Sequence, residues 1–158
     1  MRRILSGLVL AVLLLPTLAS AHCEVPCGIF DDALRIEMLR EHVTTIEKAM
    51  NQIQSLSAEE APDYNQLVRW VTTKEDHADE FQHVVSQYFL HQRVKPSSAD
   101  DAAYVQKLTL LHQLLVGAMK TKQTSDPSQL GQLRDLIDAF AESYFSPEEL
   151  EHLHNHRN

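Results

Sequence analysis

Glycine is scarce in this chain, and stretches of alternating polarity are missing from its sequence. Only four glycines occur among the 158 residues, whereas β-hairpins depend on glycine at turn positions with positive φ. No segment alternates apolar and polar residues over the length of a β-strand. The sequence therefore argues against a β-rich fold and favours an all-α one.

Positive charge is also in short supply. Lys and Arg number 14 against 22 Asp and Glu, which gives a formal net charge of −8. Nucleic acids and anionic membrane surfaces attract basic proteins, so this balance excludes them as expected partners.

The one long apolar run, Ile4 to Leu18, lies at the amino terminus and has the form of a secretion signal. Arg2 and Arg3 precede it, and Ala19-Ser20-Ala21 forms a small-x-small cleavage site. Residues 1–21 are therefore expected to be a cleaved signal peptide, and the mature protein begins at His22, outside the cytoplasm, in the periplasm or the medium. A retained membrane anchor is the alternative, which the short run disfavours because a bilayer span needs about 20 apolar residues.

Residues 31–146 contain four stretches in which apolar residues recur every three or four positions, as in amphipathic helices. Four such stripes are most simply buried in an antiparallel up-and-down four-helix bundle. The stripes are Ile36, Leu39, Val43, Ile46, Met50 and Ile53; Leu67, Val71, Ala78, Phe81, Val85 and Phe89; Val105, Leu108, Leu111, Leu115, Ala118 and Met119; and Leu130, Leu133, Leu136, Ile137, Phe140 and Tyr144.

Capping residues and prolines set the expected helix boundaries. The first helix is expected to begin near Asp31 or Asp32, and the second near residues 58–62, where Ser57-Ala58-Glu59-Glu60 has capping-box spacing. Pro96 ends the second helix. Asp126-Pro127 opens the fourth helix, and Ser146-Pro147 opens a short terminal helix in residues 147–158, which also carry a histidine-rich tail.

The segment 22–30 is the part of the sequence with the chemistry of a metal site, and we call it the hook. Cleavage after Ala21 frees the α-amine of His22 next to Cys23, and Cys27 follows four residues later. The amine, the Cys23 amide nitrogen and the Cys23 thiolate form two fused five-membered chelate rings, which hold three donors in a plane. Cys27 supplies a fourth donor if the chain doubles back, which Pro26 and Gly28 favour.

A planar set of nitrogen and sulfur donors favours nickel. Square-planar sites suit Cu(II) or Ni(II), and two thiolates tend to reduce Cu(II), whereas zinc prefers a tetrahedron. The imidazole of His22 stays free as an axial ligand that stabilises the higher oxidation state. The sequence therefore predicts a nickel ion that cycles between Ni(II) and Ni(III) and acts on a very small redox substrate.

The pattern His-Cys-x-x-Pro-Cys-Gly-x-aromatic at a processed amino terminus resembles the hook of nickel superoxide dismutases. The resemblance implies a four-helix subunit with one nickel ion, a homo-oligomer that is usually a hexamer, and disproportionation of superoxide to oxygen and hydrogen peroxide. It continues over most of the mature chain, in residues 31–33, 35–37, 66–70, 73–78, 87–89 and 107–115.

The resemblance also assigns roles around the metal. It implies that Glu37 orients the ring of His22 and that His77 stands where many members carry an arginine. Phe30 replaces a tyrosine common in the family, so the ring that shapes the approach to the metal is kept and its hydroxyl is lost. Glu24 replaces the commoner aspartate with the same charge.

Two alternatives compete with this interpretation. Two cysteines in an exported chain often form a disulfide, and a disulfide-containing bundle that only mediates contacts would not need the terminal amine. A nickel-storage protein would bind the metal through the same hook without turnover. The histidine-rich tail is expected to be solvated or to assist nickel loading; its histidines are His152, His154 and His156.

Overall fold

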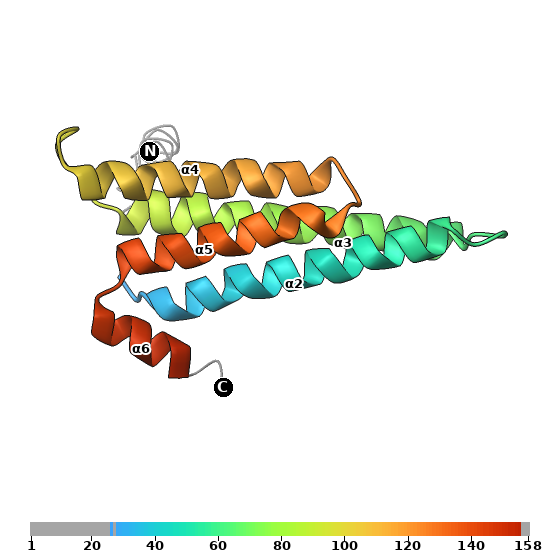
Figure 1. Cartoon of the computed structure of the whole chain (residues 1–158), viewed down its shortest axis with the longest axis horizontal. Helices are drawn as coiled ribbons and strands as arrows, with labels where there is room; N and C mark the ends of the chain where they lie inside the picture. Colours follow the sequence, from blue (N-terminus) through green and yellow to red (C-terminus); the bar gives the residue numbers. More distant parts are fainter. Residues whose placement is uncertain (1–25, 27, 156–158) are drawn as a thin grey trace, which may run out of the picture.

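The computed structural model describes Pro26 and residues 28–155, and these residues form a helical bundle. Four long helices run up and down in antiparallel order, as expected from the sequence (Figure 1). They are α2 (Asp32–Ser57), α3 (Tyr64–His83), α4 (Ala102–Lys122) and α5 (Leu130–Tyr144). A π-helical segment, η1 (Val84–Arg93), extends α3; a 3-10 turn, η2 (Pro127–Gln129), precedes α5; and α6 (Pro147–Asn155) follows it.

Side chains cap three of the helix starts that the sequence indicated. Asp31 caps α2 by accepting from the amide of Leu34 at 3.0 Å, and Asp126 caps the turn that begins with Pro127. At the start of α6 the Ser146 amide donates to Glu149 Oε2 at 2.8 Å, which is one half of a capping box.

The expected start of the second helix was wrong. Residues 58–62 form the turn between helices, and α3 begins at Tyr64, with Asp63 as its cap. The reason is that α2 continues to Ser57, and the Ala58 amide still donates to Gln54. Ser57 therefore belongs to the preceding helix and cannot cap the next one.

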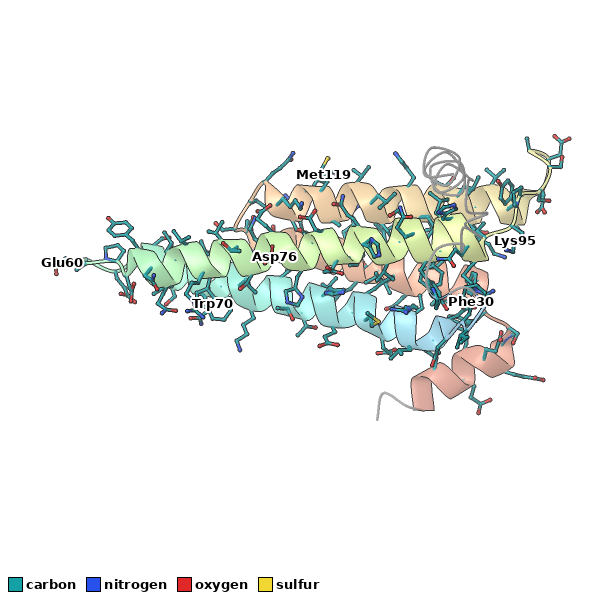
Figure 2. The ribbon with its side chains drawn as sticks, turned by 180° about the vertical axis from the view of Figure 1, so that it is seen from behind. Phe30, Glu60, Trp70, Asp76, Lys95 and Met119 are labelled. Carbon is teal, nitrogen blue, oxygen red and sulfur yellow. The ribbon has the colours of Figure 1, made fainter. Side chains whose placement is uncertain are left out.

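One buried cluster joins the helices. It includes Ile36, Leu39, Phe81, Phe89, Leu111, Leu114, Ile137 and Phe140, together with Leu153 of α6. The α2–α3 pair extends past the ends of α4 and α5, so the far part of this pair, where Trp70 is labelled, has only two helices (Figures 1 and 2).

Three expected core residues are in fact exposed. Val71 is 39% exposed, and it directly follows Trp70, which lies on the two-helix part of the bundle (Figure 2). Val105 and Met119 are each 42% exposed, because the buried face of α4 passes instead through Leu111, Leu114, Ala118 and Thr121.

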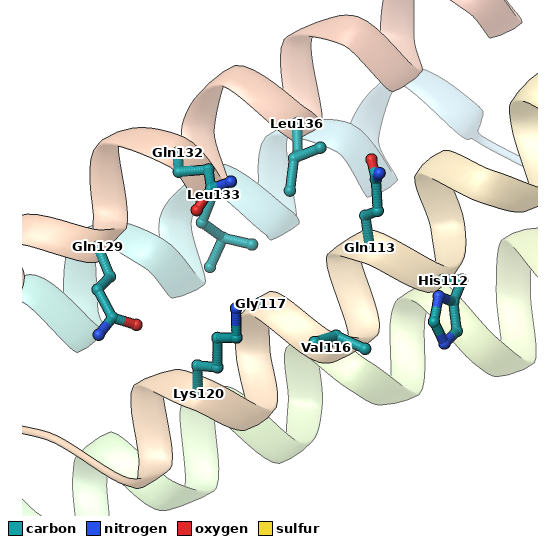
Figure 3. A pocket seen from close by; sticks show the side chains of 9 residues that line it. All are labelled: His112, Gln113, Val116, Gly117, Lys120, Gln129, Gln132, Leu133 and Leu136. Carbon is teal, nitrogen blue, oxygen red and sulfur yellow. The ribbon is translucent and has the colours of Figure 1, made fainter.

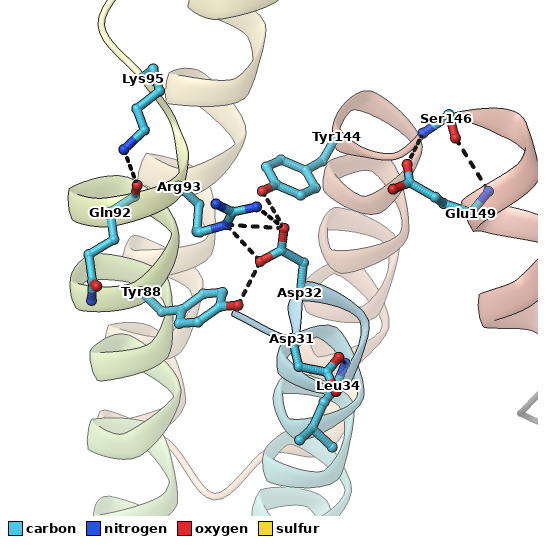
Figure 4. Close-up of polar contacts among 10 residues, drawn as sticks. All are labelled: Asp31, Asp32, Leu34, Tyr88, Gln92, Arg93, Lys95, Tyr144, Ser146 and Glu149. Carbon is cyan, nitrogen blue, oxygen red and sulfur yellow. Dashed lines mark hydrogen bonds and ion pairs between the residues drawn. The ribbon is translucent and has the colours of Figure 1, made fainter. Parts of the chain in front are cut away.

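The end of the second helix is where the structure departs most from the sequence pattern. Residues 84–93 form a π-helix, in which the Val94 amide donates to the carbonyl of Phe89 at 2.8 Å. Residues five apart lie on well-separated faces of an α-helix, which has 3.6 residues per turn. The wider i→i+5 geometry brings them closer to one face, so Tyr88 and Arg93 both point toward the start of α2 (Figure 4).

None of the helices in the described part of the chain is both long and apolar enough to span a membrane.

Candidate metal centre

The last part of the hook forms a tight turn before the bundle begins. The Ile29 amide donates to the carbonyl of Pro26 at 3.1 Å. Gly28, the third residue of this turn, has a φ of +91°. Positive φ at the third position is typical of a type II turn and favours glycine, because a Cβ there is strained. The expectation that Gly28 would supply positive φ is confirmed.

Phe30 packs the end of the hook against the bundle. Its ring centroid lies 4.3 Å from Cζ of Arg93 and 5.8 Å from the ring centroid of Tyr88. The neighbouring Ile29 is 84% exposed. Phe30 is therefore the described hook residue that joins this segment to the helices.

Immediately after Phe30, the carboxylate of Asp32 is the centre of a polar cluster (Figure 4). Arg93 donates from Nε at 2.8 Å to Oδ1 and from Nη2 at 2.6 Å to Oδ2. The hydroxyls of Tyr88 and Tyr144 donate at 2.6 and 2.7 Å. The Asp32 side chain is only 15% exposed. We call these four residues the Asp32 cluster.

The charge of Asp32 is stabilised by its partners. Burial alone would raise the pKa of the Asp32 carboxyl, but the hydrogen bonds from Arg93, Tyr88 and Tyr144 outweigh burial and hold the pKa below its usual value. Burial, followed by the hydrogen bond to Asp32, raises the pKa of both tyrosines. Near neutral pH the cluster is thus a carboxylate with neutral tyrosines and a guanidinium.

Arg35 adds a second positive charge at this end of the bundle. Its Cζ lies 5.0 Å from the ring centroid of Tyr88, and Nη1 donates to the Met38 sulfur at 3.2 Å. Its Nε is buried and has no hydrogen-bond partner among the described residues. A buried donor of this kind is costly unless it is satisfied.

Glu37 lies on the side of α2 that faces α5. Its Oε1 accepts from Arg40 Nη1 at 2.5 Å, and Arg40 Nη2 donates to Asp138 Oδ1 at 2.6 Å. The Glu37 side chain is 38% exposed, so the carboxylate is held in place and remains accessible.

His77 lies between α3 and α2, where it meets His42. The two Nδ1 atoms are 2.9 Å apart, so one ring donates and the other accepts. Burial, followed by the repulsion of His77, lowers the pKa of His42, although Glu80 and Glu41 act in the opposite direction. The structure therefore pairs Glu37 with Arg40 and His77 with His42, and does not bring Glu37 and His77 together.

The metal ligands expected from the sequence, His22, Cys23 and Cys27, lie outside the described residues, as does Glu24. Pro26, Gly28 and Phe30 are described and form the turn and its attachment. Within residues 28–155, side chains of histidine, cysteine, aspartate and glutamate form no group of three or more that could hold a metal.

Sequence reasoning missed the partners of Asp32, namely Arg93 and Tyr144. One signal was available, because Asp31 alone suffices to cap α2 and a second aspartate beside it needs another purpose. Arg93 and Tyr144 are far from Asp32 in the chain and gave no local signal.

A hollow of about 260 Å³ borders Arg93 and Tyr144 of the Asp32 cluster, and two others lie beside the hook and between helices. A pocket of about 290 Å³ adjoins Phe30 and is also lined by Asp31, Asp32, Ala33, Phe145 and Glu149. A groove of about 200 Å³ lies between α4 and α5, with His112, Lys120 and Gln132 on its rim (Figure 3). The groove contains no acidic or sulfur ligand and none of the expected site residues.

The described residues form a helical bundle, and the segment before it is the one for which the sequence predicts metal-binding chemistry. The model of the nickel-containing superoxide dismutase family matches residues 17–147, which is most of the 158-residue chain and includes the hook. The chain belongs to this family. It is a nickel-dependent superoxide dismutase that disproportionates superoxide to oxygen and hydrogen peroxide by Ni(II)/Ni(III) cycling, with one nickel ion per subunit. Neither the curated proteins nor the solved structures yielded a significant match.

Proposed function

We propose that His22, Cys23 and Cys27 bind the nickel ion with which this enzyme disproportionates superoxide. The donors are the His22 amine and imidazole, the Cys23 amide nitrogen and the two thiolates. The observation that carries the proposal is the Pro26–Ile29 turn with its positive-φ glycine, because a chain that reverses there suits donors on both sides of Pro26. Among common metals, nickel fits such a nitrogen and sulfur set best.

Nickel held by these donors supplies a site that accepts and returns one electron. The chain's own residues stabilise the oxidised state, orient the ring of His22 and shape the approach to the metal. Anionic thiolate and amide donors stabilise the oxidised state, and Glu37 hydrogen-bonds the ring of His22, which fixes its orientation and raises its basicity. Glu24, Pro26, Gly28 and Phe30 shape the approach. His77 is included among the surrounding residues, and its role is tested in the Discussion.

The substrate approach requires local positive charge. Superoxide is an anion and the protein carries an acidic excess, so a negative surface repels it. Arg35 has no acidic partner among the described ion pairs, and it lies against Tyr88, which contacts Phe30. We assign to Arg35 the compensation of that repulsion beside the hook.

Export and assembly are further parts of the proposal. Residues 1–21 are a signal peptide whose removal frees His22, so the enzyme acts in the periplasm or medium. The protein is a homo-oligomer, a homohexamer by family resemblance. Exposed apolar side chains on α3 support self-association; they are Tyr64 at 71%, Val68 at 62% and Val71 at 39% exposure. Native mass spectrometry of exported protein tests both statements, since a retained leader or a monomer would contradict them.

The histidine-rich tail is proposed to be solvated or to assist nickel loading. Leu153 is 2% exposed and belongs to the core cluster, so truncating the chain after Leu150 would also damage the bundle. A variant with Asn at His152, His154 and His156 tests loading alone. Unchanged loading at limiting nickel would eliminate the assisting role.

X-ray absorption on the nickel-loaded mature protein, together with superoxide decay kinetics, separates the alternatives. The enzyme requires two sulfur ligands and turnover, and Cys27→Ser should remove one sulfur and abolish turnover. Bound nickel without turnover in the wild-type chain would favour a storage protein. Sulfur-free coordination would reject the hook as the metal site and favour the disulfide-containing bundle.

A further inference from the structure

The Asp32 cluster exceeds what a helix start requires. Asp31 already caps α2, yet Asp32 is almost buried and accepts from Arg93, Tyr88 and Tyr144. A carboxylate has about four acceptor sites, and the two nitrogens of Arg93 with the two tyrosine hydroxyls satisfy them. The residues come from α2, η1 and α5, so three elements meet at this one carboxylate.

The start of a helix can be made stable without such an arrangement. A buried ion pair costs desolvation and is often replaced by apolar residues without loss of stability. The π-helix that turns Tyr88 and Arg93 toward Asp32 is likewise uncommon and is frequent at functional sites. The ion pair and the π-helix, both departures from ordinary helix packing, therefore involve the same carboxylate, that of Asp32.

Arg93 and Tyr88 also hold the end of the hook. The Arg93 guanidinium contacts Asp32 through hydrogen bonds and the face of Phe30 at 4.3 Å. Tyr88 donates to Asp32 and meets the Phe30 ring at 5.8 Å. Holding the Asp32 carboxylate in place therefore also holds Arg93 and Tyr88, the two side chains that contact the Phe30 ring. A cation over an aromatic face needs the ring and not a hydroxyl, so phenylalanine at this position keeps the contact.

We propose that Asp32 is a positioning residue for the nickel hook, acting through Arg93 and Tyr88 on Phe30. This inference rests on the proposed function, because it concerns the segment that binds the metal there. Its consequence is that loosening the cluster speeds loss of nickel without any change in the ligands.

The test measures nickel release from the loaded, full-length mature protein into excess EDTA. Asp32→Asn, which removes the charge and keeps the shape, should accelerate release about ten-fold, the lower end of what outer-shell changes cost. Tyr144→Phe removes one hydroxyl and keeps the ion pair, and it should accelerate release less. Asp135→Asn makes the same change of charge as Asp32→Asn at an exposed residue of α5 and should have no effect.

A destabilised control separates positioning from general loss of structure. Leu130→Ala opens the core at the far end of α5 and should lower the melting temperature without faster release. The proposal is overturned if Asp32→Asn releases nickel at the wild-type rate, or if Leu130→Ala accelerates release as much. If Asp32→Asn does not fold, the rate of nickel release from Tyr144→Phe is the test, and a wild-type rate in that variant overturns the proposal. A wild-type chain that retains no nickel would instead overturn the proposed function and this inference with it.

Discussion

Replacing Glu37 with glutamine should separate its role at the metal from its role in the fold. The Glu37 carboxylate accepts from Arg40, and both belong to α2. Exposed pairs of this kind contribute about 0.2–1 kcal/mol, and Arg40 keeps its bond to Asp138 in the variant. A loss below about 1 kcal/mol corresponds to at most about 4 °C in melting temperature for a domain of this size.

The expected effect on activity is much larger. If Glu37 orients the ring of His22, the variant should lose about 10–100-fold in superoxide disproportionation, because outer-shell carboxylates have effects of this size. The matched control is Glu47→Gln on the same helix, whose carboxylate pairs with Arg134 at 2.8 Å and is also 38% exposed. Stopped-flow superoxide decay and thermal melts should show equal melting temperatures and unequal activities. Equal activities in the two variants would refute the role of Glu37.

Two further predictions concern the turn and the histidine pair. Gly28→Ala places a Cβ at a φ of +91°, which should destabilise the turn by about 1–2 kcal/mol and weaken nickel binding measured by titration. Unchanged binding would contradict the turn's role. Because the pKa of His42 is lowered in the folded state, the unfolded chain binds more protons below the unperturbed value of 6.5. Stability is therefore complete above pH 6.5 and falls as the pH drops below it, by up to about 1.4 kcal/mol per pH unit. Urea unfolding of His42→Gln should show a shallower pH dependence of stability. His77→Gln should show a smaller change, because burial, the larger cause of the lowered His42 pKa, remains, and its activity should be kept if His77 serves only the pair. A loss of activity in His77→Gln at unchanged nickel content would place it in the metal's surroundings.

The sequence predicted the bundle well because helix signals are local. Caps such as Asp31 and apolar spacing such as Ile36 and Leu39 act within one or two turns, and the structure confirms them. Val71 was misassigned because its exposure depends on how far α3 projects past α4, which no local pattern encodes. The π-helix was missed for the same reason, since its geometry serves a tertiary contact between Arg93 and Asp32.

In the candidate site, too, the parts formed by chain neighbours could be predicted and the parts brought together by folding could not. The donor atoms of the hook are neighbours in the chain, so their chelate rings could be derived from covalent connectivity alone. Arg93 and Tyr144 reach the start of the bundle only through folding, 61 and 112 residues from Asp32. The pairing of His77 with His42 likewise depends on the register of α3 against α2, whereas the family resemblance implied a place for His77 near the metal.

The dependence of turnover on a free amine at His22 is the most direct test of how this enzyme binds its metal. Superoxide decay is followed for nickel-loaded protein that begins at His22 and for protein with one alanine added before it. The added residue replaces the amine by an amide, and we expect activity to be lost while the melting temperature of the bundle is kept. Equal activity of the two proteins would contradict the proposed metal centre.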